Sequence, residues 1–134
     1  MKPFINSILT LVAAVAIGAG CAHEPNKAGV EYIPENSEKF VMMDSGTQHS
    51  IAANTLQEAR LPDGRLDVAA NVRNRENRRI QVQVNCEFKD AQGLSIDSTP
   101  WRTLILTENG QETVRFASMN AQASRYTIRI RQAR

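Results

Sequence analysis

At 134 residues the chain has room for one domain, since domains of about 100–150 residues are the most common. A formal net charge of +2, with 22% charged and 5% aromatic residues, excludes the strongly basic composition of nucleic-acid-binding domains. From residue 66 onward eleven basic residues stand against seven acidic ones, an asymmetry too mild to make nucleic acid an expected partner.

Residues 1–20 are typical of a secretory signal peptide. Lys2 provides the positive start, and a 17-residue apolar stretch follows from position 4 to position 20, interrupted by three polar residues. A transmembrane helix needs about 20 apolar residues, so this stretch is at the lower limit. An uncleaved membrane anchor is therefore the weaker alternative.

Residues 17–21 (Ile-Gly-Ala-Gly-Cys) resemble the lipobox of bacterial lipoproteins, although Gly18 stands where a Leu is usual. The resemblance implies that the peptide before Cys21 is removed and that Cys21 carries a lipid. Three acyl chains exceed the two signals needed for stable membrane anchoring. Ala22, rather than Asp, follows the cysteine, and the enterobacterial sorting rule then implies the periplasmic face of the outer membrane.

Residues 21–39 read as the lipidated cysteine followed by a flexible tether. They lack apolar periodicity and contain two prolines and a glycine. A flexible chain of this length typically spans roughly 20–25 Å, which would keep the following domain close to its membrane. Residues 40–134 then form the predicted domain.

The clearest strand pattern covers residues 80–88, where five apolar positions alternate with four polar ones. This period is typical of a strand with one buried and one solvent-exposed face. Cys86 falls on the apolar side, so we expect a buried residue; an intermolecular disulfide or a reactive thiol is the alternative.

Other segments repeat the alternation, including 66–73, 113–116 and 126–131, with turns such as Pro62-Asp63-Gly64 between them. Residues 40–44 suggest a short first strand. Residues 51–59 suit a helix or a strand, and we favour the strand because the rest of the pattern is β. Together these segments predict an all-β domain, an immunoglobulin-like β-sandwich of six to seven antiparallel strands.

Three stretches occur in a familiar order: residues 63–74, residues 80–93, and residues 101–104 before a Gly-containing turn and Val114. Across residues 40–134 they resemble the YcfL family of small periplasmic lipoproteins of unknown function, which implies the same sandwich. An aromatic pair usual in that family is replaced here by Phe88-Lys89. The resemblance assigns no catalytic or binding residues.

Residues that could carry catalysis are not grouped in a recognisable way. His23 and His49 have no cysteine or carboxylate at metal-ligand spacing, and no serine lies in a Gly-x-Ser-x-Gly elbow. We therefore expect no enzymatic activity, no metal and no cofactor.

Arginine is the residue type that could carry binding, because its guanidinium group pairs with carboxylates and phosphates through two parallel hydrogen bonds. The candidate residues are Arg73, Arg75, Arg78 and Arg79 around one polar loop, and Arg129 and Arg131 on the last strand. The alternative is a solvated face whose charges protect a strand edge from aggregation. Trp101, the only tryptophan, is expected in or at the edge of the core, with a surface-binding role as the alternative.

These observations favour a lipid-anchored, non-catalytic envelope protein that binds another envelope protein or peptidoglycan. The alternative is an accessory lipoprotein subunit of a secretion apparatus or of a peptidoglycan synthase. Small lipoprotein sandwiches serve such assemblies, and the likeness is one of fold alone.

Overall fold

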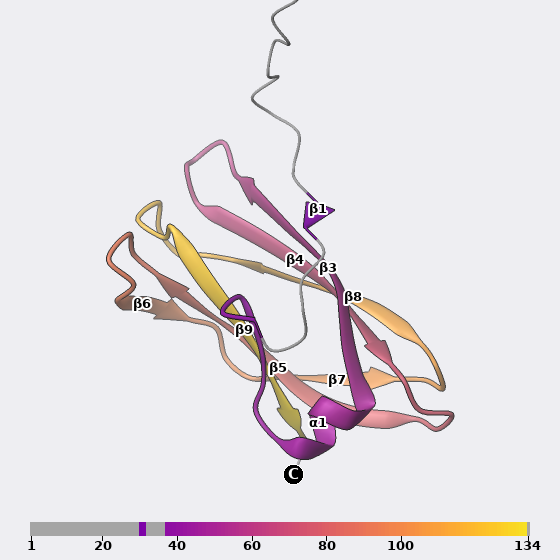
Figure 1. The fold of residues 1–134 in the computed structure, drawn as a ribbon. Helices are drawn as coiled ribbons and strands as arrows, with labels where there is room; N and C mark the ends of the chain where they lie inside the picture. The colour runs from indigo at the N-terminus through magenta and orange to yellow at the C-terminus, as the bar shows by residue number, and fades with distance from the viewer. Residues whose placement is uncertain (1–29, 32–36, 134) are drawn as a thin grey trace, which may run out of the picture.

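The computed structural model describes residues 30–31 and 37–133, which form two packed β-sheets (Figure 1). The strands are β1 (Val30–Glu31), β2 (Phe40–Met42), β3 (Ile51–Arg60), β4 (Leu66–Asn74), β5 (Ile80–Lys89), β6 (Ser95–Ser98), β7 (Arg102–Leu106), β8 (Gln111–Ala117) and β9 (Arg125–Gln132), and the one helix among the described residues is α1 (Ser45–Ser50). None of the described helical segments has the length and apolar character to cross a membrane.

The first sheet has the strand order β1-β3-β4-β8, and the second has the order β2-β9-β5 with both β6 and β7 paired to β5. β9 pairs along one edge of β5, and the other edge accommodates two strands because β7 pairs with its first half and β6 with its last residues. The predicted all-β sandwich is confirmed, and the ambiguous segment 51–59 is a strand. Seven of the described strands have four or more residues, while β1 and β2 are shorter.

β2 runs parallel to β9, with Phe40 opposite Ile128 and Met42 opposite Ile130. This pair departs from the fully antiparallel prediction. Parallel neighbours need a long crossover between them, and here the whole intervening domain supplies it.

The helix α1 carries the chain from β2 in the second sheet to β3 in the first. Asp44 caps it, accepting a 2.8 Å hydrogen bond from the Thr47 backbone N–H, and its other carboxylate oxygen accepts one from the Gln132 N–H at the end of β9. Partial burial favours the neutral form of Asp44, but these donors outweigh it and hold its pKa below the ordinary value. One carboxylate thus connects the crossing segment to the last strand.

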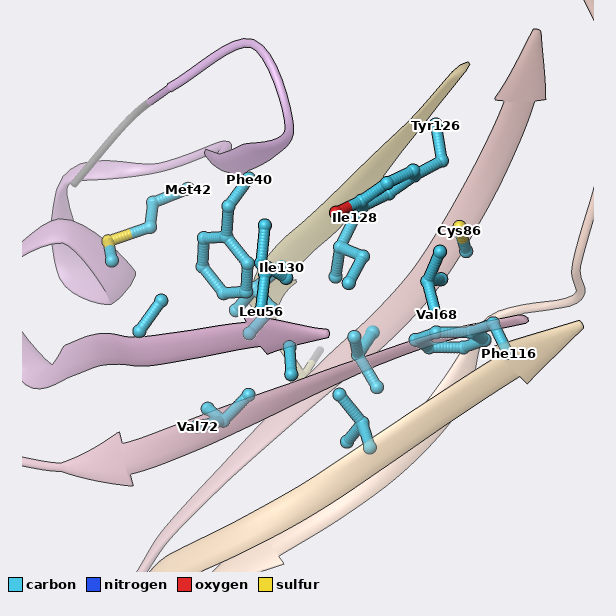
Figure 2. Packing of buried hydrophobic residues seen from close by; sticks show 14 of the residues in the cluster. Phe40, Met42, Leu56, Val68, Val72, Cys86, Phe116, Tyr126, Ile128 and Ile130 are labelled. Atoms are coloured by element: carbon cyan, nitrogen blue, oxygen red, sulfur yellow. The ribbon is translucent and has the colours of Figure 1, made fainter. Parts of the chain in front are cut away.

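The core lies between the sheets, and its aromatic and aliphatic side chains interdigitate across the gap (Figure 2). Phe40, Met42 and Leu56 pack at the end near α1, while Phe116 and Tyr126 lie toward the other end. The inward residues of β5 are Val82, Val84, Cys86 and Phe88, all buried. The predicted faces of this strand are therefore confirmed.

Replacing Val84 by Asp should abolish cooperative folding. Val84 is fully buried on the strand that pairs with β6, β7 and β9. Burying a carboxylate costs on the order of several kcal/mol, comparable with the roughly 5–15 kcal/mol stability of a typical domain. Thermal unfolding followed by circular dichroism measures the effect, with Gln81→Asp on the exposed side of the same strand as control. Cooperative unfolding of Val84→Asp near the temperature of the parent would contradict the assignment of the faces.

Candidate functional site

The side of the second sheet that faces away from the core, hereafter the outer face, carries two of the predicted arginines. Arg129 lies opposite Asn85 and Arg131 lies opposite Gln83 on β5. Their neighbours Ile128 and Ile130 are fully buried. The alternation of β9 therefore places both guanidinium groups on one surface.

Trp101 lies on the outer face and is not among the core residues. The ring centroid is 3.9 Å from the guanidinium carbon of Arg131 and 5.7 Å from that of Arg129. A cation over an aromatic ring contributes about 0.5–1 kcal/mol at an exposed site and more when desolvated.

The expectation of a core or core-edge tryptophan is corrected here, and the reason is the parity of the strand. Arg102 pairs with Val84, an inward position, so the residue before it falls on the opposite side. Leu104 and Leu106 share the parity of Arg102, not that of Trp101. Trp101 and Leu104 are three positions apart, and in a strand an odd separation places two side chains on opposite sides. This spacing is the sequence signal that predicts the outer placement of Trp101.

Arg129 is held by partners within the outer face. Its Nε donates to Asn85 Oδ1 at 3.0 Å, Nη2 donates to Ser98 Oγ at 3.4 Å, and Nη1 lies 3.5 Å from Glu87 Oε2. Asn85 is itself buried and also donates to the Thr99 carbonyl. Because a buried amide needs such partners, Arg129 stabilises the sheet, and its charge is balanced by Glu87.

Arg131 has a different environment. Its Nε donates to Gln83 Oε1 at 3.0 Å, and Trp101 covers one side of the guanidinium plane. Within the described part of the chain, its two terminal amino groups have no hydrogen-bond or ion-pair partner. Arg131 therefore presents an oriented guanidinium group whose remaining N–H donors are free to bind a ligand.

A hollow of about 280 Å³ adjoins Arg131, and Met43, Asp44, Gln132 and Ala133 complete its lining. Both oxygens of Asp44 are occupied by backbone N–H groups. Met43 is 51% exposed there, and Ile105 on β7 is 45% exposed. At this hollow the outer face thus combines an oriented guanidinium group with exposed apolar side chains.

The four arginines of the β4–β5 region do not converge on one point. Arg73 lies in β4 opposite Gln111, on the first sheet. Arg75, in the following loop, donates its backbone N–H to the Ser50 carbonyl.

Arg78 and Arg79 line a hollow of about 330 Å³ together with α1 and the end of β9. Arg78 pairs with the Glu76 carboxylate. Gln132 and Ala133 line this hollow and also the one beside Arg131, so Arg78 and Arg79 lie near the outer face while Arg73 lies apart from it.

Asn74 fixes the conformation of this arginine-bearing loop. Its buried side chain donates to the carbonyls of Arg78 and Thr107, at 2.7 and 2.8 Å, and accepts from the Glu76 N–H. The side chain therefore connects the β4–β5 loop to the β7–β8 loop. The polar groups of Asn74 thus serve to hold the two loops together.

Two further predictions fall partly or wholly beyond the described residues. The signal peptide and Cys21 lie outside them, as does most of the tether. Within the tether segment, Val30 and Glu31 pair with Gln57 and Leu56 of β3. Val30, where the described residues begin, thus follows position 21 by nine positions.

A family model described as a protein of unknown function, DUF1425, matches residues 38–132. The chain belongs to the DUF1425 family. This agrees with the resemblance to YcfL-like proteins, which are DUF1425 proteins.

Two solved structures are similar to this DUF1425 chain, and at these identities they show the fold alone. A DUF1425 member from Shewanella sp. pv-4 is 22% identical with a TM-score of 0.59, covering 79% of this chain and 97% of that one. Cj0090 from Campylobacter jejuni is 13% identical with a TM-score of 0.61, covering 72% of this chain and all of that one. No curated protein sequence matches the chain.

The DUF1425 domain contains one cysteine among its described residues, Cys86, and it is buried. Burial raises the pKa of its thiol to about 12, with a smaller opposing effect from Arg129. The thiolate, which is the reactive form, is therefore strongly disfavoured. Among residues 37–133, no three His, Cys, Asp or Glu side chains are grouped so as to hold a metal ion.

Cys86 should resist alkylation in the folded chain. At pH 8 a pKa of about 12 instead of 9.0 leaves roughly a thousandth of the ordinary thiolate population, and burial also blocks access. Treatment with iodoacetamide, followed by mass analysis of the peptide containing Cys86, should give almost no modification in buffer and complete modification in denaturant. Equal rates in the two conditions would show that the thiol is accessible.

Proposed function

We propose that this chain is a non-catalytic, lipid-anchored binding module of the bacterial cell envelope, and that it binds through the outer face of the second sheet. The observation that carries the proposal is Arg131, stacked on Trp101 with its terminal amino groups unpaired among the described residues. Trp and Arg are the residue types most enriched among those that dominate binding energy at protein interfaces. The buried Cys86, with its raised pKa, supports the non-catalytic part.

A lipid at Cys21 would hold the domain close to the periplasmic face of the outer membrane. Val30, nine positions after Cys21, pairs with Gln57 of β3. Fully extended, that segment spans roughly 30 Å. Because β1 pairs with β3, the reach from a lipid at Cys21 to the domain is set by nine positions and not by all of residues 22–39.

An accessory subunit of a secretion apparatus or of a peptidoglycan synthase is the more specific form of the same proposal. An oriented Arg131 and a stacked Trp101 favour a partner with a complementary, fixed surface, since preorganised groups lose little entropy on binding. A diffuse set of partners, or peptidoglycan itself, would indicate a general binder instead.

Replacing Cys21 by Ser should release the protein from the membrane fraction, because the thiol that accepts the lipid is lost. Fractionation of cell envelopes followed by immunoblotting gives the result, and Cys86→Ser serves as the matched control that keeps the lipidation site. Retention of the Cys21→Ser protein in the membrane would refute the lipid anchor.

A photoreactive amino acid at Ile105 should cross-link the binding partner in living cells, because Ile105 is 45% exposed on the outer face. The same group at Arg115, exposed on the first sheet, is the matched control. The Ile105 adduct should disappear when Trp101 is replaced by Ala.

One stoichiometric adduct would favour the subunit of a defined machine, and several adducts or a peptidoglycan adduct would favour the general binder. The proposal fails if Ile105 gives no adduct, or if the adducts at the two positions are the same.

A further inference from the structure

We infer that the outer face receives a protein segment in which a single carboxylate lies next to an apolar side chain, with the carboxylate bound to the terminal amino groups of Arg131. This inference rests on the proposed function and specifies the chemistry of the partner. It follows from three features of the outer face: the orientation of one guanidinium group, the balance of charge around it, and the apolar side chains beside it.

The guanidinium group of Arg131 is fixed before any ligand arrives. The centroid of the Trp101 ring lies 3.9 Å from the central guanidinium carbon, and the 3.0 Å hydrogen bond to Gln83 Oε1 sets the rotation of the group in its plane. Gln83 lies directly opposite Arg131 in the β5–β9 register, so both ends of this bond are held by the sheet. The two terminal amino groups then present the parallel donors that a carboxylate accepts in a bidentate pair.

The charges close to Arg131 favour one carboxylate over a polyanion at this position. Arg129 already lies 3.5 Å from Glu87, and the Asp44 carboxylate lines the hollow beside Arg131. These four groups have no net charge, and of the two arginines only Arg131 lacks a carboxylate partner among the described residues. The cations Lys89 and Arg125 share this face but lie at the opposite end of β9 from Arg131. A lipid phosphate cluster or another polyanion would meet the charges of Glu87 and Asp44, whereas a single carboxylate needs only Arg131.

Apolar surface adjoins the same donor. Met43, which is 51% exposed, lines the 280 Å³ hollow together with Arg131, and Trp101 covers the guanidinium plane. An aliphatic side chain next to the bound carboxylate would cover Met43 and remove the donor from competing water. A protein segment carries both chemical groups on neighbouring residues, which an isolated anion does not.

The single tryptophan makes the inference testable by nuclear magnetic resonance, because the chain has one indole N–H signal. The full chain, purified from membranes in detergent micelles, is titrated with acetyl-Leu-Glu-Leu-amide and with the matched acetyl-Leu-Gln-Leu-amide. We expect the Glu peptide to shift the Trp101 indole and the Arg131 Nε–H signals to saturation. The affinity of the Gln peptide should be lower by about tenfold or more, because its side chain lacks the charged acceptor.

Arg131→Gln should abolish the preference for Glu over Gln, and Arg131→Lys should reduce it because an ammonium group lacks the fork of parallel donors. The lysine variant also keeps the charge should the glutamine variant fold poorly. Arg115→Gln, on the other sheet, should bind as the parent does. Sodium polyphosphate serves as the polyanion probe and should bind more weakly than the Glu peptide.

Equal affinity for the two peptides, an unchanged preference in Arg131→Lys, or tighter binding of polyphosphate would overturn the inference. If the Trp101-dependent cross-link from Ile105 forms while the peptides are not distinguished, the inference fails and the proposed function stands. If no cross-link forms from Ile105, the proposed function itself fails.

Discussion

The pairing register of β5 with β9 determines both surfaces of the second sheet. Cys86 lies opposite Ile128 on the core side, and Gln83 lies opposite Arg131 on the solvent side. Because side chains alternate along a strand, a shift of one residue would move Arg131 into the core and Ile130 onto the surface. Burying a charge costs several kcal/mol, so the burial of the apolar side chains of β5 and β9 determines the register. The register in turn determines where the arginines lie.

Two arginines that look equivalent in the sequence are used differently in this arrangement. Arg129 bonds to Asn85 and lies beside Glu87, and these contacts satisfy a buried amide and balance a charge. Arg131 makes one such bond and stacks on Trp101. The first side chain supports the sheet, and the second is left with donors to offer. The alternative of a simple solvated face describes Arg129 poorly and leaves the orientation of Arg131 unexplained.

The strands with long alternation were predictable, since β5 and β9 each bury one face and expose the other. The helix α1 was not, because residues 45–50 are polar without apolar periodicity and depend on the cap at Asp44. The parallel pairing of β2 with β9 joins segments almost ninety positions apart, which no local pattern encodes. Arg73 and Arg79 are close in sequence but not in the structure. Arg73 lies in β4 on the first sheet, whereas Arg79, after the β4–β5 loop, lines the hollow beside α1. The face on which Trp101 lies, by contrast, is predictable from the alternation of side chains along β7.

Recognition of a single carboxylate is weak by itself, and the proposed anchor explains why weak recognition could be enough. With Val30 paired to β3, a lipid at Cys21 would hold Val30, and with it this edge of the domain, within roughly 30 Å of the membrane. A short tether raises the effective concentration of a neighbouring membrane-bound partner to about the millimolar range. A contact of millimolar to micromolar affinity would then be substantially occupied in the envelope and nearly empty in free solution. On this view the anchor makes encounters with membrane-bound partners frequent, and the Arg131–Trp101 pair determines which of these partners is bound.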